Sequence, residues 1–125
     1  MPTKILIVED DPAARRLLSF TLESAGYHVI EAANGLEGLQ KAQHEAPALV
    51  VLDVMLPGID GFEVCHRLRS AAWHNVPVLM LSAKAQASDR RAGKRVGADL
   101  YLTKPATPQD ITAAVGDLLR QSKAA

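Results

Sequence analysis

The side chains best able to do chemistry in this sequence each follow a short apolar run. The runs and the polar residues that end them are 5–8 with Glu9 and Asp10, 48–52 with Asp53, 78–81 with Ser82, and 100–103 with Lys104. If these runs are parallel strands, their carboxyl ends share one edge of a sheet, where ligands bind in such folds. Carboxylates, a hydroxyl and an ammonium at one edge would form a site for a divalent metal ion and a phosphoryl group.

Asp53 is the candidate nucleophile, because a carboxylate can form a covalent acyl phosphate. Glu9 and Asp10 would repel it unless a cation is present, and Mg²⁺ is expected because it prefers oxygen ligands. Lys104 would supply a fixed positive charge for the phosphoryl oxygens, and Ser82 could donate a hydrogen bond to one of them. Positioning and charge neutralisation are most of what phosphoryl transfer requires.

The elements that must position these residues alternate between strand and helix five times, which predicts an α/β fold with a parallel sheet. We expect strands over about 4–8, 27–31, 48–52, 78–81 and 100–103, and helices over about 12–25, 35–45, 61–71, 88–96 and from 108 onward. Leu17 and Leu36 are assigned to the apolar faces of the first two helices, Asp11 to a helix cap, and Trp73 to a loop anchor over the third helix. The fourth helix is the weakest, because Gly93 in its middle costs about 1 kcal/mol relative to alanine.

Composition limits the classes of function. The 125 residues are expected to form one domain over 1–125, with a core of aliphatic side chains because 48% of residues are hydrophobic and only 4% aromatic. Basic and acidic residues both number 14, so no excess of positive charge supports direct binding to nucleic acid. Cys65 is the only cysteine, which excludes an internal disulfide, and we expect it to be a small core residue. No signal peptide or apolar span is evident, so we expect a cytoplasmic chain without membrane insertion.

The arrangement of motifs resembles the receiver domain of two-component response regulators. The motifs that carry the resemblance are, in chain order, Val8-Glu9-Asp10, Asp53 with Met55-Leu56-Pro57-Gly58 and Asp60-Gly61, Leu81-Ser82-Ala83, Gly97-Ala98-Asp99 and Lys104-Pro105. They extend over nearly the whole chain in family order and spacing. The resemblance implies a CheY-like, doubly wound (βα)5 flavodoxin-like fold, with a parallel sheet of order 2-1-3-4-5 and helices on both faces.

The resemblance also assigns roles to the site residues. Asp53 would accept a phosphoryl group from a sensor histidine kinase, a phosphotransfer protein or a small acyl phosphate. The implied Mg²⁺ ligands are Asp10, Asp53 and the backbone carbonyl of Met55, with Glu9 acting through water. The implied contacts to the phosphoryl group are the side chains of Lys104 and Ser82 and the amides of Val54 and Ala83.

A conformational switch is implied as well. Movement of Ser82 toward the phosphate would let Tyr101 turn inward and reshape the face of the fourth helix, fifth strand and fifth helix, which controls binding of a downstream effector. The Lys104-Pro105 bond is expected to be cis. The chain would promote its own phosphorylation without a separate substrate, and it would dephosphorylate slowly because Met55 cannot orient a water molecule.

Two departures from the family pattern stand out. Ala106 follows Lys104-Pro105 where the family often has Phe, which predicts looser packing at the start of the fifth helix. Leu100 replaces the second Asp of the transcription-factor subfamily, so a monomer or weak homodimer is expected. Two alternatives stay open: a degenerate receiver that is only an interaction module, and a phosphatase of the haloacid dehalogenase type. The latter needs a second Asp at the position of Met55.

Overall fold

Five strands and five helices alternate along the described part of the chain, as the sequence predicts. The computed structural model describes residues 2–71 and 75–124. The strands are β1 (Lys4–Val8), β2 (His28–Ala32), β3 (Leu49–Leu52), β4 (Val78–Ser82) and β5 (Leu100–Thr103). The helices are α1 (Pro12–Ser24), α2 (Gly35–Glu45), α3 (Gly61–Ser70), α4 (Ala87–Arg95) and α5 (Pro108–Ala124). Trp73, expected to anchor a loop over the third helix, lies outside the described residues.

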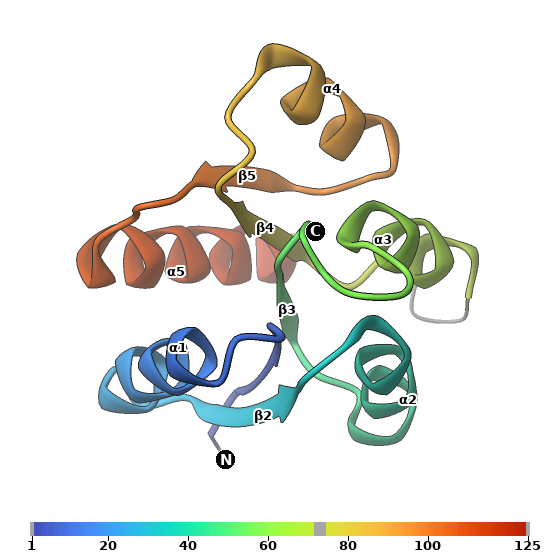
Figure 1. Ribbon diagram of the computed structural model, residues 1–125. Helices are drawn as coiled ribbons and strands as arrows, with labels where there is room; N and C mark the ends of the chain where they lie inside the picture. The colour runs from blue at the N-terminus through green and yellow to red at the C-terminus, as the bar shows by residue number, and fades with distance from the viewer. Residues whose placement is uncertain (1, 72–74, 125) are drawn as a thin grey trace.

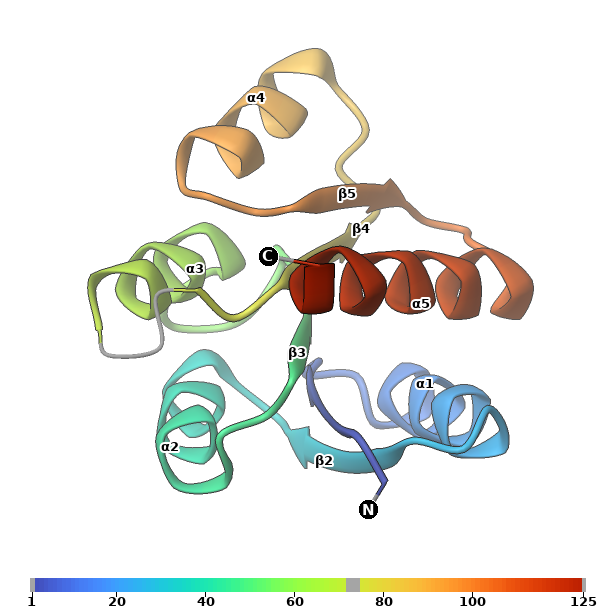
Figure 2. The same ribbon diagram turned by 180° about the vertical axis from the view of Figure 1, so that it is seen from behind.

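The strands form one parallel sheet of order β2-β1-β3-β4-β5, which confirms the predicted topology. Figures 1 and 2 show α1 and α5 on one face of the sheet and α2 and α3 on the other, with α4 beside the β5 edge. The register pairs Val8 with Leu52 and Ser82 with Thr103. The carboxyl ends of β1, β3, β4 and β5 therefore meet at one edge of the sheet.

Alternating side chains of β1 divide the core into two layers. Leu6 and Val8 pack on the side of α2 and α3, whereas Ile5 and Ile7 pack on the side of α1 and α5. Burial on both faces explains why the central strands read as continuous apolar runs rather than alternating ones. Cys65 belongs to the first layer, where burial raises the pKa of its thiol to about 11. The expectation of a core cysteine is therefore confirmed.

Two helical faces differ from the prediction. Leu17 in α1 is 60% exposed, and Leu36 in α2 is 58% exposed. In α1 the adjacent Leu18 is buried as expected, but Thr21 also turns inward, so the buried face is rotated away from Leu17. In α2 the buried positions are mainly small, since a Cβ atom at Gly38 would lie 2.8 Å from a methyl carbon of Val8. The helix approaches β1 too closely for a leucine to fit between them.

The helix caps lie where the sequence places them. Asp11 accepts a hydrogen bond from the amide of Ala14 at 3.0 Å, which confirms its assignment as the cap of α1. Thr107 and Asp110 cap α5 reciprocally, at 3.0 and 3.1 Å. The cap of α1 directly follows Asp10, and the cap of α5 shortly follows Lys104. Asp10 and Lys104 therefore lie on short loops, each held in place by the start of the next helix.

Candidate functional site

Three carboxylates converge at the carboxyl ends of β1 and β3. Glu9, Asp10 and Asp53 each offer one oxygen atom, and these oxygen atoms lie within 4.8 Å of one another. Glu9 and Asp53 are buried, whereas Asp10 is exposed. The amide of Asp53 donates to the carbonyl of Val8 at 3.1 Å, so the sheet itself sets the spacing between the two acidic segments.

Lys104 reaches this cluster from the end of β5. Its ammonium group lies 2.8 Å from Oε1 of Glu9 and 3.2 Å from Oδ2 of Asp53. Burial alone would lower the pKa of Lys104, but the hydrogen bond to Glu9 and the charge of Asp53 outweigh it, so the pKa lies above its ordinary value. The Lys104-Pro105 bond is cis, as expected.

The backbone of the loop after β3 orients Asp53. The amide of Met55 donates to Oδ1 of Asp53 at 3.1 Å, leaving Oδ2 for Lys104. Gly61 lies against this loop: its amide donates to the carbonyl of Val54, and a Cβ atom added to it would lie 2.3 Å from the carbonyl oxygen of Asp53. The amide of Met55 and the close approach of Gly61 are two features that sequence reasoning missed, because neither depends on a side chain.

Ser82 and Tyr101 lie on the neighbouring strands. Ser82 is fully buried at the end of β4, and its oxygen accepts a hydrogen bond from the amide of Lys84 at 3.2 Å. Tyr101 is half-buried on β5 and donates to the carbonyl of Lys84 at 2.7 Å. Burial raises the pKa of its phenol above the ordinary value. Both candidate switch residues therefore contact the same segment after β4.

Arg90 holds Tyr101 from the side of α4. Its guanidinium carbon lies 5.7 Å from the centre of the Tyr101 ring, and its Nη2 donates to the hydroxyl of Thr103 at 2.5 Å. Gly93 is the only buried residue of α4, and a Cβ atom there would lie 2.9 Å from the Tyr101 ring. α4 therefore buries little of its own surface, and Arg90 adds polar contacts to β5; the weakness predicted for this helix stays a prediction.

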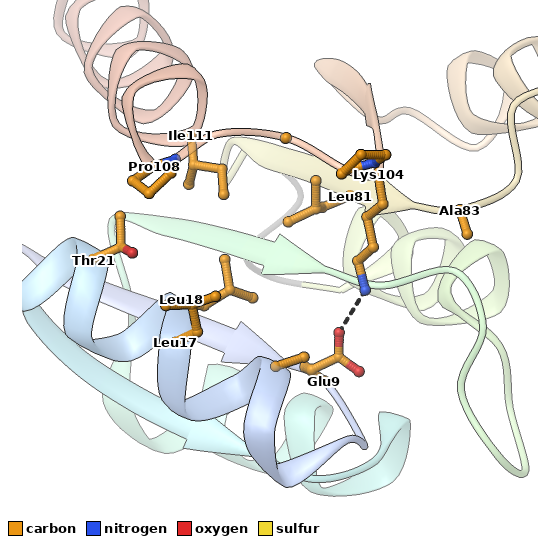
Figure 3. A pocket seen from close by; sticks show the side chains of 12 residues that line it. Glu9, Leu17, Leu18, Thr21, Leu81, Ala83, Lys104, Pro108 and Ile111 are labelled. Carbon is orange, nitrogen blue, oxygen red and sulfur yellow. Dashed lines mark hydrogen bonds and ion pairs between the residues drawn. The ribbon is translucent and has the colours of Figure 1, made fainter.

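An apolar cavity of about 470 Å³ adjoins the Glu9–Lys104 pair and extends between α1 and the start of α5. Figure 3 shows Leu18 and Ile111 on opposite walls and the ion pair at one end. Ala106 is among its lining residues. The space at the start of α5 agrees with the looser packing expected from alanine at this position.

The donor set fits a hard divalent cation. Mg²⁺ prefers oxygen ligands and is commonly held by one or two carboxylates, and Asp10 and Asp53 provide these beside the buried Glu9. Among the described residues, Lys104 is the one cation within ion-pair distance of Glu9 or Asp53. The three carboxylates outweigh the single charge of Lys104, and Asp10 is open to solvent, so the cluster could hold a divalent cation.

Comparisons with known proteins agree with this geometry. The family model of the response regulator receiver domain matches residues 5–116. The alkaline phosphatase synthesis transcriptional regulatory protein PhoP of Bacillus subtilis is 47% identical over 125 residues, covering 100% of this chain and 52% of that protein. The chain spans about half the length of the curated relatives it matches.

Solved structures show the same fold. The chemotaxis protein CheY4 of Vibrio cholerae is 34% identical with a TM-score of 0.90, over 94% of this chain and 99% of that one. A CheY-like receiver domain protein of Methanospirillum hungatei is 29% identical with a TM-score of 0.94, over 99% and 98%. Within the described residues, none of the helices has the length and apolar character needed to span a membrane.

Proposed function

Because the chain belongs to the response regulator receiver domain family of two-component systems, we propose that it accepts a phosphoryl group on Asp53 in an Mg²⁺-dependent reaction. The observation that carries this proposal is the position of the Asp53 carboxylate. One oxygen is fixed by the Met55 amide and the other faces Lys104, with two more carboxylates alongside. A nucleophile oriented in this way, beside a cation and metal ligands, has what phosphoryl transfer requires.

In the proposed reaction, an oxygen of Asp53 forms a bond to phosphorus as the bond between phosphorus and the donor's leaving group breaks. Lys104 then exchanges its contact with Asp53 for the phosphoryl oxygens, while Glu9 retains the other side of the ammonium. Bound Mg²⁺ would neutralise the developing charge on the phosphoryl oxygens. Asp10, Asp53 and the Met55 carbonyl would hold it directly, and Glu9 would hold it through water. Ser82 and the amides of Val54 and Ala83 would complete the phosphoryl contacts.

The partners proposed are a sensor histidine kinase or phosphotransfer protein as donor and a downstream effector as target, in the cytoplasm. The chain would act as a single domain over 1–125, as a monomer or weak homodimer. Receiver domains are phosphoacceptors rather than enzymes with a separate substrate. Self-dephosphorylation would be slow, because Met55 is exposed beside the site and carries no group able to orient water.

The two alternatives are less well supported. A phosphatase of the haloacid dehalogenase type lacks its required acid, since Met55 stands at that position. An interaction module without phosphorylation would not need these polar side chains to lie together. The carboxylate oxygens of Glu9, Asp10 and Asp53 lie within 4.8 Å of one another, and Lys104 pairs with Glu9 and Asp53.

Magnesium should stabilise the folded chain. Because the metal ion would bind the folded cluster and not the unfolded chain, Mg²⁺ at about ten times its Kd should raise the melting temperature by about 4–7 °C. Asp10→Asn should melt at a higher temperature than wild type without Mg²⁺, because it removes one crowded charge, and should respond less to Mg²⁺. Thermal unfolding with and without Mg²⁺ measures both effects. An unchanged wild-type melting temperature at millimolar Mg²⁺ would exclude a metal site at the cluster.

The attachment of α4 should depend on Arg90. Arg90→Ala removes the contacts to the Tyr101 ring and the Thr103 hydroxyl, so amide hydrogens of α4 should exchange about tenfold faster, equivalent to the loss of one charge-assisted hydrogen bond. Arg91→Ala, at an exposed neighbouring position, is the matched control and should leave the exchange rates unchanged. Hydrogen–deuterium exchange with mass spectrometry makes the comparison. Equal rates in the two variants would show that Arg90 does not hold the helix.

A further inference from the structure

Arg15 connects three segments around the acidic cluster without touching its carboxylates. Its Nη1 donates to the carbonyl of Glu9 at 2.8 Å and lies 3.4 Å from the carbonyl of Asp10. Its Nε donates to Oε1 of Glu31, at 3.1 Å on the edge strand β2. The Arg15 side chain is only 19% exposed, so the guanidinium is held between α1, β2 and the loop after β1.

The loop needs such a support because the sheet stops holding it at Glu9. The amide of Glu9 donates to the carbonyl of Ala32, but the carbonyls of Glu9 and Asp10 lie beyond the strand ladder and point toward Arg15. Among the described residues, the carboxylate of Asp10 accepts no hydrogen bond. The backbone position of Asp10 therefore sets where that carboxylate can reach, and Arg15 holds this backbone.

The place of Arg15 in α1 also favours a specific task. Arg15 is in the first turn of the helix, where a positive charge is unfavourable because the helix dipole is positive at that end. No acidic residue occurs within this turn; close to it lie Asp11, which caps the helix, and Glu31, which pairs with Arg15 from β2. An arginine whose charge opposes the helix is better explained by its hydrogen bonds to the Glu9–Asp10 backbone than by helix stability.

We propose that Arg15 is a positioning residue that holds the Glu9–Asp10 segment in the conformation that binds the metal ion. This inference rests on the proposed Mg²⁺ site and extends it to a residue that would touch neither metal nor phosphate. Two effects of Arg15 oppose each other. Its charge repels a cation, whereas its hydrogen bonds keep Asp10 directed toward Asp53. The proposal requires the second effect to exceed the first.

The sign of the change in Mg²⁺ affinity separates the two effects. Arg15→Gln removes the charge and the bridge, and Arg15→Lys keeps the charge but cannot donate to the backbone and to Glu31 with one planar group. If positioning dominates, both variants should bind Mg²⁺ about tenfold more weakly, as is typical when a group supporting a metal ligand is removed. Arg16→Gln removes an equal charge at the adjacent exposed position and is the matched control.

The experiment is isothermal titration calorimetry of Mg²⁺ into wild type, the two Arg15 variants and Arg16→Gln, with circular dichroism to confirm folding. A Kd raised in both Arg15 variants and unchanged in Arg16→Gln supports the proposal. The proposal is overturned if Arg15→Gln binds Mg²⁺ as tightly as wild type or more tightly. It is also overturned if Arg15→Lys has the same Kd for Mg²⁺ as wild type. If Arg15→Gln does not fold, Glu31→Ala removes the acceptor at the other end of the same bridge and should also raise the Kd, and an unchanged Kd there overturns the proposal. Absence of Mg²⁺ binding by wild type would instead contradict the proposed metal site.

Discussion

Replacing Lys104 by alanine should slow phosphorylation of Asp53 by acetyl phosphate by about 10²–10³-fold, the usual cost of removing one preorganised donor from a reacting anion. Lys104 is the one cation among the described residues within ion-pair distance of Asp53, and it also contacts the buried Glu9. Its loss leaves the incoming phosphoryl group facing carboxylates without a fixed positive charge. The rate is measured from the appearance of phosphorylated chain in intact-mass spectra over time.

The same substitution should not weaken Mg²⁺ binding, because removing a positive charge beside the carboxylates makes the site more attractive to a cation. If Lys104→Ala is phosphorylated slowly but still binds Mg²⁺ as tightly as wild type or more tightly, the variant is folded. The slower phosphorylation then results from the missing ammonium group. Lys94→Ala, an exposed lysine on α4, is the control. A wild-type rate of phosphorylation in Lys104→Ala would contradict the role proposed for this ammonium group.

The raised pKa of Lys104 fixes the pH range in which its charge matters. Because the folded pKa lies above the unfolded value of about 10.4, its contribution to stability is fully present below that value. The contribution is lost only as the pH rises through the folded pKa. Lys104 therefore stays protonated at neutral pH, and it should cause no change in phosphorylation rate between about pH 6 and 9.

Gly61→Ala should lower the free energy of unfolding by about 1–3 kcal/mol, the usual range for inserting a methyl group where no space exists. The new Cβ atom would lie 2.3 Å from the carbonyl oxygen of Asp53 and 2.7 Å from Cα of Val54, so the backbone rather than a flexible side chain must move. Phosphorylation should slow as well, since the displaced segment carries the nucleophile. Urea denaturation measures the stability change as a shift in midpoint.

Gly116→Ala provides the contrast for this prediction. Gly116 is inside α5, where the nearest atom to an added Cβ is the end of the flexible Arg120 side chain at 3.3 Å. Alanine there should raise the free energy of unfolding by up to about 1 kcal/mol through helix propensity. If Gly61→Ala unfolded at the same urea concentration as wild type, the close contact between α3 and the Asp53 backbone would not exist in solution.

The sequence pattern was sufficient to predict a parallel sheet of five strands and to place Asp10, Asp53 and Lys104 at one edge of it. Parallel strands bring their carboxyl ends together, so the residues that follow the apolar runs lie at the same edge of the sheet. This holds however the intervening helices are packed. Family resemblance then supplied the order of the strands. The roles assigned to individual residues by that resemblance, including water-mediated ligation by Glu9, stay predictions.

Other features depend on how helices rotate and approach, which periodicity does not determine. Leu17 and Leu18 are adjacent and both fit the apolar face expected for α1, but the packing of the helix buries Leu18 and leaves Leu17 exposed. Leu36 fits the apolar spacing of α2, yet the helix lies so close to β1 that Gly38 occupies the contact. The sequence gives no signal for the contacts of Arg15 and Arg90, since their partners include backbone carbonyls and an aromatic ring from other segments.

The most direct measurement of the central claim is the intact mass of wild type and Asp53→Asn after incubation with acetyl phosphate and Mg²⁺. Wild type should gain the mass of one phosphoryl group, and omission of Mg²⁺ should reduce the gain. Asp53→Asn keeps the size of the side chain but removes the nucleophilic carboxylate, so its mass should not change. A wild-type chain that gains no phosphoryl mass, or an Asp53→Asn chain that gains as much as wild type, would contradict the assignment of Asp53 as the phosphoacceptor.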